Sequence, residues 1–254
     1  MKTRFPRLRR HVAARFSPTE AFGLHLTIGV ALLLLGTWIF ASIANAVFAH
    51  AAMSALDVRV AHYFHQFAAS AWTMPMLVVT TWHNTAGIAC MGSLLAYYFY
   101  RRKLRYWLLA TLLAVPGGML LNVLLKYTFQ RARPTFDAPL LTLTTYSFPS
   151  GHTTGAAMVY GIAAAYLVCR SRHWAPRVMA LTLGCAMVAL VAFSRVYLGV
   201  HYLSDVLASL AVALAWLSVC ISASATLRRR AQNRFESKQQ KYSASEQADT
   251  GESL

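Results

Sequence analysis

Acidic residues are scarce in this chain: 8 of its 254 residues are aspartate or glutamate, against 24 lysines and arginines. Charged residues of both signs make up 13% of the sequence, whereas soluble domains carry about a quarter. A soluble globular domain is therefore excluded, and no acidic cluster suited to magnesium is present. Cysteine is also rare. We interpret Cys90, Cys169, Cys185 and Cys220 as small packing residues, because their spacing fits neither a zinc site nor a disulfide framework.

Long apolar runs take up much of the chain. Residues 21–48 and 61–100 contain no charged side chain, and both runs exceed the ~20 residues that cross a bilayer. Helices are the only open-chain structures that satisfy every backbone group in lipid. We interpret His83 and Asn84, inside the second run, as residues that form a structural hydrogen bond to another helix, more readily than as catalytic residues. The sequence predicts an all-α polytopic membrane protein with six transmembrane helices, in residues 21–48, 61–100, 106–125, 153–169, 178–193 and 203–227.

Lysine and arginine determine the predicted orientation. With six spans, nineteen of the 24 cations fall on one side, which must be the cytoplasm. This predicts a multi-pass protein of the cell inner membrane with both termini cytoplasmic. We expect a basic leader (1–20), a membrane domain (21–227) and a disordered polar tail (228–254). The first run is too long for a signal peptide and is expected to be an uncleaved anchor, with cleavage after Ala46 or Ala49 as the alternative.

The segment between the first two runs has apolar residues at helical spacing from Leu56 to Phe67 and polar residues on its other faces. This pattern predicts a helix lying in the outer interface. Asp57, His62 and His65 have the chemistry of metal ligands, but nothing else in the segment completes a coordination shell. We therefore interpret these residues as an interfacial polar face. The net charge of +16 is interpreted as a cytoplasmic collar and not as a nucleic-acid surface.

Ionisable residues at membrane depth are costly and are functional by default. Lys126 closes the third predicted span, Arg133 follows before a proline, and Arg195 closes the fifth span. Ser150 and Gly151 directly precede the fourth span, where free N–H groups and the helix dipole favour an anion. All of these positions map to the outer side. Three cations and one helix N-terminus predict a site for a dianionic phosphate.

Two histidines accompany the cations. His201 and Asp205 lie four residues apart, so on a helix they share a face. A carboxylate bonded to one ring nitrogen leaves the lone pair of the other nitrogen free to attack. His152 follows the Ser-Gly turn and is placed to protonate a leaving oxygen as general acid. The pattern predicts nucleophilic attack on phosphorus.

Taken together, three strings resemble the signature of the type 2 phosphatidic acid phosphatase superfamily: Lys126-x6-Arg133-Pro134, Pro149-Ser150-Gly151-His152 and Ser194-Arg195-x5-His201-x3-Asp205. Vanadium haloperoxidases and bacterial acid phosphatases share this signature, and every position matches. The resemblance implies an all-helical core, a phosphohistidine on His201, and His152 as acid and base. It also implies metal-independent catalysis without a cofactor. The expected phosphate-binding residues are Lys126, Arg133, Ser150, Gly151 and Arg195.

The expected activity is hydrolysis of a lipid phosphate or pyrophosphate exposed on the outer leaflet. By analogy with the family, undecaprenyl pyrophosphate is the first choice of substrate, followed by phosphatidylglycerol phosphate and phosphatidic acid. A lipid A phosphatase or phosphotransferase is an alternative with the same chemistry. A non-catalytic six-span protein that binds or transports anions is an alternative of another class. Membrane lipids are the expected partners, and the oligomeric state is not predicted.

Overall fold

A computed structural model describes residues 24–49 and 51–251. The described chain is helical and contains no strand. At the site end, three segments without helix connect the helices: 66–72, the loop 130–150 and the short connection 198–202. The helices are α2 (Leu24–Ala49), α3 (Ala51–His65), α4 (Thr73–Trp82), α5 (Thr85–Arg101), α6 (Arg105–Phe129), α7 (Gly151–Arg170), α8 (Trp174–Tyr197) and α9 (Leu203–Gly251).

Five of these helices are long and apolar enough to cross a membrane: α2, α6, α7, α8 and the part of α9 up to Ser237. The predicted second span (61–100) is not one helix: it begins in α3, passes through the turn 66–72 and continues as α4 and α5, and α5 has 17 residues. The division follows from Asn84, whose extended backbone and side chain cap α5 by accepting a hydrogen bond from the Gly87 N–H at 2.8 Å. The protein is thus an all-helical, multi-pass membrane protein, and the count of six spans stays a prediction.

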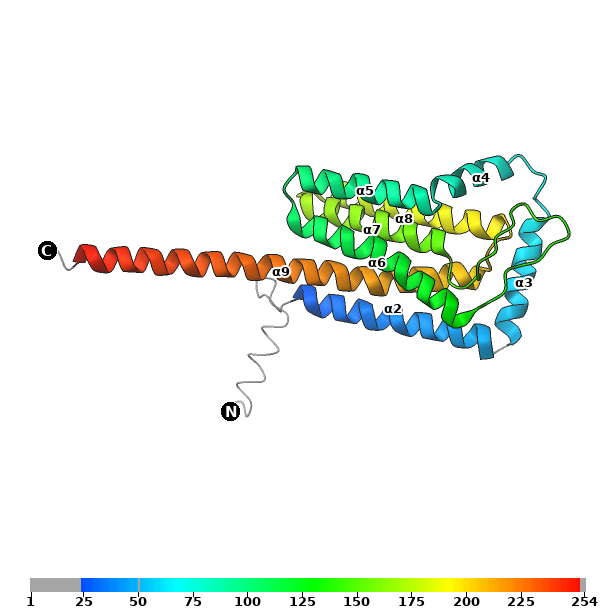
Figure 1. Ribbon diagram of the computed structural model, residues 1–254, viewed down its shortest axis with the longest axis horizontal. Helices are drawn as coiled ribbons and strands as arrows, with labels where there is room; N and C mark the ends of the chain where they lie inside the picture. The colour runs from blue at the N-terminus through cyan, green and yellow to red at the C-terminus, as the bar shows by residue number, and fades with distance from the viewer. Residues whose placement is uncertain (1–23, 50, 252–254) are drawn as a thin grey trace.

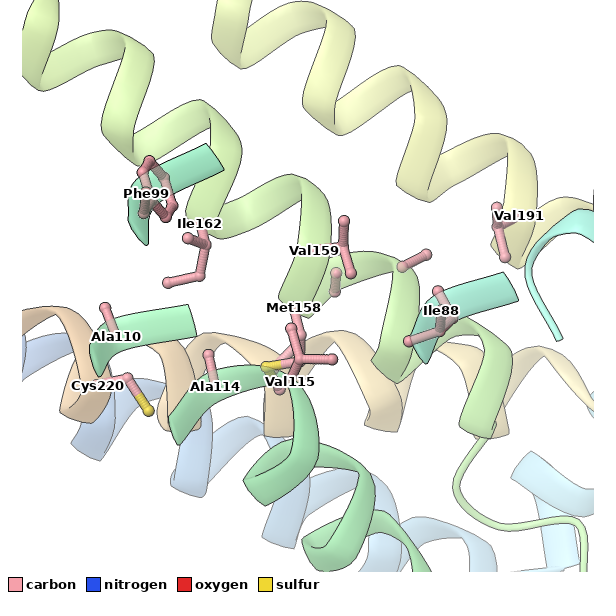
Figure 2. Close-up of a cluster of buried hydrophobic side chains, with 13 residues drawn as sticks. Ile88, Phe99, Ala110, Ala114, Val115, Met158, Val159, Ile162, Val191 and Cys220 are labelled. Atoms are coloured by element: carbon pink, nitrogen blue, oxygen red, sulfur yellow. The ribbon is translucent and has the colours of Figure 1, made fainter. Parts of the chain in front are cut away.

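Helix α7 lies at the centre of the bundle, where it packs on α5, α6, α8 and α9. Small residues in its first half permit this close packing: a Cβ atom at Gly155 would lie 2.9 Å from Ile88. The buried core runs along α7 and includes Met158 and Ile162, with Val115 facing them from α6 (Figure 2). Helices α2 and α9 pack side by side along one edge of the bundle (Figure 1). This arrangement brings one end of α6, α7, α8 and α9 together.

Helix α3 lies across that same end of the bundle, beside the loop 130–150 (Figure 1). Its predicted helical character is confirmed, but the interpretation of Asp57 as part of an exposed polar face is wrong. Asp57 is 0% exposed and forms an ion pair with Arg131. No group of three metal-ligating side chains occurs in the described residues, His62 and His65 included. The interfacial position of α3 stays a prediction.

The polar tail differs from its prediction. Helix α9 continues without interruption from the bundle to Gly251 (Figure 1), where composition had indicated disorder. From Arg228 onward the chain has neither proline nor glycine before Gly251, and it is rich in arginine, glutamine, lysine and alanine. These residues are good helix formers, so helix propagation from the apolar part is favoured. The predicted leader (1–20) lies outside the described residues.

All four cysteines are free, as predicted. Cys220 is buried in the core, which agrees with a packing role. Cys90, Cys169 and Cys185 are instead exposed on their helices, so the packing interpretation is wrong for these three.

Candidate active site

A cavity of about 270 Å³ opens at the end of the bundle where the three sequence motifs meet. Six of the eight predicted site residues line it: Lys126, Arg133, Gly151, His152, Arg195 and His201. They come from the end of α6, the loop after it, the start of α7, the end of α8 and the connection to α9. Segments that are far apart in sequence thus converge on one chamber, and both predicted catalytic imidazoles face it.

Among the described residues, the cations of this cavity have no acidic partners. Lys126 donates its Nζ hydrogens to the carbonyls of Tyr146 and Ser147, the latter at 3.5 Å. Arg195 is 1% exposed; its Nη1 donates to the hydroxyl of Thr80, and its Nε has no partner. In the described part of the chain, neither of these residues nor Arg133 forms an ion pair. Buried unpaired charge is costly, so the cavity is built to receive an anion.

Arg133 contacts both the loop and the predicted nucleophile, His201. Its Nε donates to the carbonyl of Thr145 at 2.7 Å, and its Nη1 donates to the carbonyl of Val200 at 2.6 Å. The same Nη1 lies 3.2 Å from Nε2 of His201. Because guanidinium nitrogens only donate, Nε2 must be the unprotonated nitrogen of this ring. The lone pair of His201 therefore resides on the atom that faces the cations.

The other nitrogen of His201 meets a carboxylate. Nδ1 lies 3.3 Å from Oδ2 of Asp205 and 3.3 Å from the hydroxyl of Ser147. Asp205 is 0% exposed and lies behind the ring, outside the cavity lining. This geometry matches the predicted pair and assigns the Nδ1 proton to the carboxylate side. Burial, followed by the positive charges of Arg195, Arg133 and Lys126, lowers the pKa of His201 well below its ordinary value. The ring is therefore neutral near pH 7.

The start of α7 supplies the remaining predicted residues. Gly151 and His152 line the cavity, and their amides lie in the first helical turn, which has no intrahelical acceptors. Ser150 is not brought to the cavity: its N–H donates to the carbonyl of Asp205 at 3.3 Å, and its hydroxyl accepts from Thr153 at 3.1 Å. Ser150 thus joins the ends of α7 and α9, and its predicted contact with phosphate stays a prediction.

Several residues of the site were missed or read differently from sequence. His83 lines the cavity and forms the predicted interhelical hydrogen bond, from its ring to the Tyr160 hydroxyl at 2.8 Å. Ser147 donates to Asp205 with no motif to mark it. Asp57 and Arg131 lie just behind the site. One signal was available for this last pair: Asp57 is the only acidic residue between Glu20 and Asp137, and an acid so isolated in an apolar chain indicates a specific partner.

Comparison with known proteins agrees with this geometry. A model of the PAP2 superfamily matches residues 105–229, which include all three motifs. The chain is 40% identical over 122 residues to phosphatidylglycerophosphatase B of Bacillus subtilis (strain 168), covering 46% of this chain and 57% of that protein. It is 33% identical over 119 residues to undecaprenyl-diphosphatase of Sulfolobus acidocaldarius, covering 44% of this chain and 53% of that protein. The alignments thus span little more than half the length of these curated relatives.

A solved structure extends the match. The crystal structure of a transmembrane PAP2-type phosphatidylglycerolphosphate phosphatase from Bacillus subtilis superposes with a TM-score of 0.60 and 31% sequence identity. The superposition covers 75% of this chain and 94% of that protein. Because nearly the whole of a solved relative is reproduced, and the three motifs meet in one cavity, this chain belongs to the PAP2 superfamily.

Proposed function

We propose that this protein is a membrane lipid phosphatase that works through a phosphohistidine on His201. One observation carries the proposal: three cations, none with an acidic partner in the part of the chain that the structure describes, surround a neutral imidazole inside a single cavity. A phosphoryl group supplies a negatively charged partner for the side chains of Lys126, Arg133 and Arg195. It also brings a phosphorus atom within the reach of Nε2.

The first step forms a bond between Nε2 of His201 and phosphorus while the bond between phosphorus and the lipid oxygen breaks. The leaving oxygen takes a proton from His152, acting as general acid. Charge that develops on the phosphoryl oxygens is met by the side chains of Lys126, Arg133 and Arg195 and by the first amides of α7. These groups are held in place before substrate arrives, so little reorganisation is needed.

The second step returns the enzyme to its starting state. Water attacks the phosphohistidine, His152 accepts a proton from that water, and the bond between phosphorus and Nε2 breaks. Inorganic phosphate leaves the cavity. No residue outside the described site is required, and no metal or other cofactor takes part in either step.

The lipid nature of the substrate is supported by a second cavity of about 330 Å³ between α5 and α6. It is lined mainly by apolar and small residues, and it shares Thr85, Ile88 and Met119 with the phosphate cavity. A lipid whose phosphate lies in the phosphate cavity has its apolar chain next to the cavity between α5 and α6. Burial of the chain there is favourable by about 0.8 kcal/mol per CH₂.

Phosphatidylglycerol phosphate is the substrate we propose, because a relative at 40% identity and the superposed structure both carry its name. Undecaprenyl pyrophosphate, the expectation from sequence, is the second candidate, because a relative at 33% identity is named for that activity. Both substrates present a terminal phosphate on an apolar anchor. The phosphate cavity accommodates that shared part.

The proposed location is the inner membrane, with both termini in the cytoplasm and the active site on the outer side. The distribution of cations supports it: Lys126, Arg131, Arg133 and Arg195 lie at the active-site end, and the basic loops lie at the other. Arg101 at the end of α5 and Arg170 at the end of α7 mark that cytoplasmic side.

One assay tests these proposals together. Full-length protein in detergent with EDTA is given phosphatidylglycerol phosphate, undecaprenyl pyrophosphate, phosphatidic acid or lipid A, and phosphate release is measured. We expect release without metal, its loss in His201→Ala, and no change in His173→Ala, a control at an exposed histidine on the loop before α8. Full activity in His201→Ala would overturn the phosphohistidine mechanism. Transfer of the phosphoryl group from phosphatidylglycerol phosphate to added lipid A, with no release of inorganic phosphate, would indicate a phosphotransferase.

A further inference from the structure

Behind the proposed nucleophile lies a buried chain of charges that links three separate segments. Asp57 of α3 and Asp205 of α9 are both 0% exposed, and the guanidinium of Arg131 lies between them. Nη2 of Arg131 donates to Oδ2 of Asp57 at 2.8 Å, and Nη1 donates to Oδ1 of Asp205 at 2.7 Å. Neither Asp57 nor Arg131 lines the phosphate cavity. The Arg131 guanidinium contacts Asp205, so an effect of the pair on His201 is expected to pass through this carboxylate.

The contacts of Arg131 leave it little freedom. Its Nη1 uses one hydrogen on Asp205 and the other on the hydroxyl of Ser204 at 2.7 Å. The central carbon of its guanidinium lies 4.2 Å from the ring centroid of Tyr202. Asp57 in turn accepts from the Ser204 N–H at 3.0 Å and from the Ser204 hydroxyl. These groups hold one another in defined positions, which makes the link rigid.

We infer that Arg131 and Asp57 are positioning residues for the attacking histidine. An isolated carboxylate as buried as Asp205 is driven to take up a proton, and a neutral carboxyl group no longer holds the Nδ1 proton of His201. Arg131 keeps Asp205 ionised by pairing with it. Asp57 fixes Arg131 from the other side, and one guanidinium between two carboxylates gives the link a net charge of about −1.

Position matters as well as charge. Oδ2 of Asp205 accepts from Ser147 and from the Tyr202 N–H at 2.9 Å, so Oδ1 is the oxygen left for Arg131. Without Arg131 the carboxylate is held through Oδ2 alone, and its position beside Nδ1 of His201 is less firmly fixed. The proton is then free to move to Nε2, and the lone pair no longer faces phosphorus. The inference therefore rests on the proposed function, in which Nε2 is the nucleophile.

The test uses full-length protein in detergent with phosphatidylglycerol phosphate. The variants are Asp57→Asn, Arg131→Gln and their combination, with Asp137→Asn as control at an exposed acid on the same loop as Arg131. For each variant we measure kcat, KM, thermal stability and the rate at which acid-labile phosphoenzyme forms after rapid mixing.

We expect Arg131→Gln to lower kcat and the phosphorylation rate about 10- to 100-fold, by analogy with the loss of a residue that orients a metal-bound histidine. KM should stay unchanged, because Arg131 does not contact the phosphate. Asp57→Asn should give a smaller loss. The double variant should be no slower than Arg131→Gln, because Asp57 acts through Arg131. Asp137→Asn should behave as the wild type.

Three results overturn the inference: wild-type kcat in Arg131→Gln, a raised KM with unchanged kcat, or fully additive losses. If Arg131→Gln does not fold, Asp57→Asn, which keeps the volume of the side chain, decides by the same criteria. Arg131→Lys, which restores the charge, should recover part of kcat. Failure of the proposed function is distinguishable, because wild-type protein would then form no phosphoenzyme and His201→Ala would stay active.

Discussion

Two replacements of Arg133 distinguish the effect of guanidinium geometry on activity from the effect of its positive charge. Arg133 donates from three nitrogens, to the carbonyls of Thr145, Tyr146 and Val200, to the hydroxyl of Thr145 and to Nε2 of His201. Lysine has one nitrogen and cannot reach this divergent set. Loss of one donor aimed at developing charge costs about 10²–10³ in kcat, or about 2.7–4 kcal/mol. We expect a loss of that size in Arg133→Lys.

The charge of Arg133 is tested by Arg133→Gln. The pKa of His201 lies well below 6.5, first because the ring is buried and then because Arg195, Arg133 and Lys126 repel its proton. In the proposed mechanism His201 attacks as the neutral ring, so activity should be lost as pH falls through that pKa. Removal of one cation raises the pKa. The acid limb of kcat/KM should therefore move to higher pH in Arg133→Gln and stay in place in Arg133→Lys.

The assay is phosphate release from phosphatidylglycerol phosphate between pH 4 and pH 9 for wild type and both variants (about the range over which carboxyl and imidazole groups titrate). Titration of the substrate itself cancels from the comparison, since all three proteins receive the same lipid. Arg59→Gln, at an exposed arginine of α3, is the matched control. An acid limb that moves to lower pH in Arg133→Gln, or near-normal kcat in Arg133→Lys, would refute the reasoning.

Three further changes test other parts of the structure. Thr80→Val removes the partner of buried Arg195 and should destabilise the protein by about 1–3 kcal/mol; an unchanged melting temperature in detergent contradicts this. Ala89→Trp narrows the cavity between α5 and α6 and should raise KM for a long-chain lipid phosphate more than for a short-chain one. Equal changes in KM for the two substrates would contradict the proposal that this cavity binds the lipid chain. Tyr160→Phe leaves the ring of His83 without its hydroxyl partner; stability should fall by about 1 kcal/mol with kcat nearly unchanged, and a large kcat loss would indicate a catalytic role for His83.

The parts of the site that sequence predicts are those fixed locally. Lys126, Gly151 and Arg195 lie at the ends of apolar segments, and both hydropathy and a short motif mark these ends. His201 and Asp205 are four residues apart, so their pairing needs only local geometry. For these residues, position along the chain nearly determines position in space.

Contacts across long stretches of chain were not predictable in the same way. Asp57 and Arg131 are 74 residues apart, and periodicity alone assigned Asp57 to an interfacial polar face. Hydropathy likewise missed the division between α4 and α5, because one capping asparagine outweighs an apolar neighbourhood. The tail was misjudged because low hydrophobicity was taken as disorder, although its residues favour a helix when an existing helix precedes them.

The pairing of α2 with α9 joins the first and the last described helices of the protein. The nucleophile and its carboxylate are also contributed late, at the connection before α9 and in its first turn. While the chain is being synthesised, a nascent protein ending before α9 has its cations and its general acid but no completed attacking group. In the proposed mechanism, activity therefore requires the start of α9, which supplies Asp205.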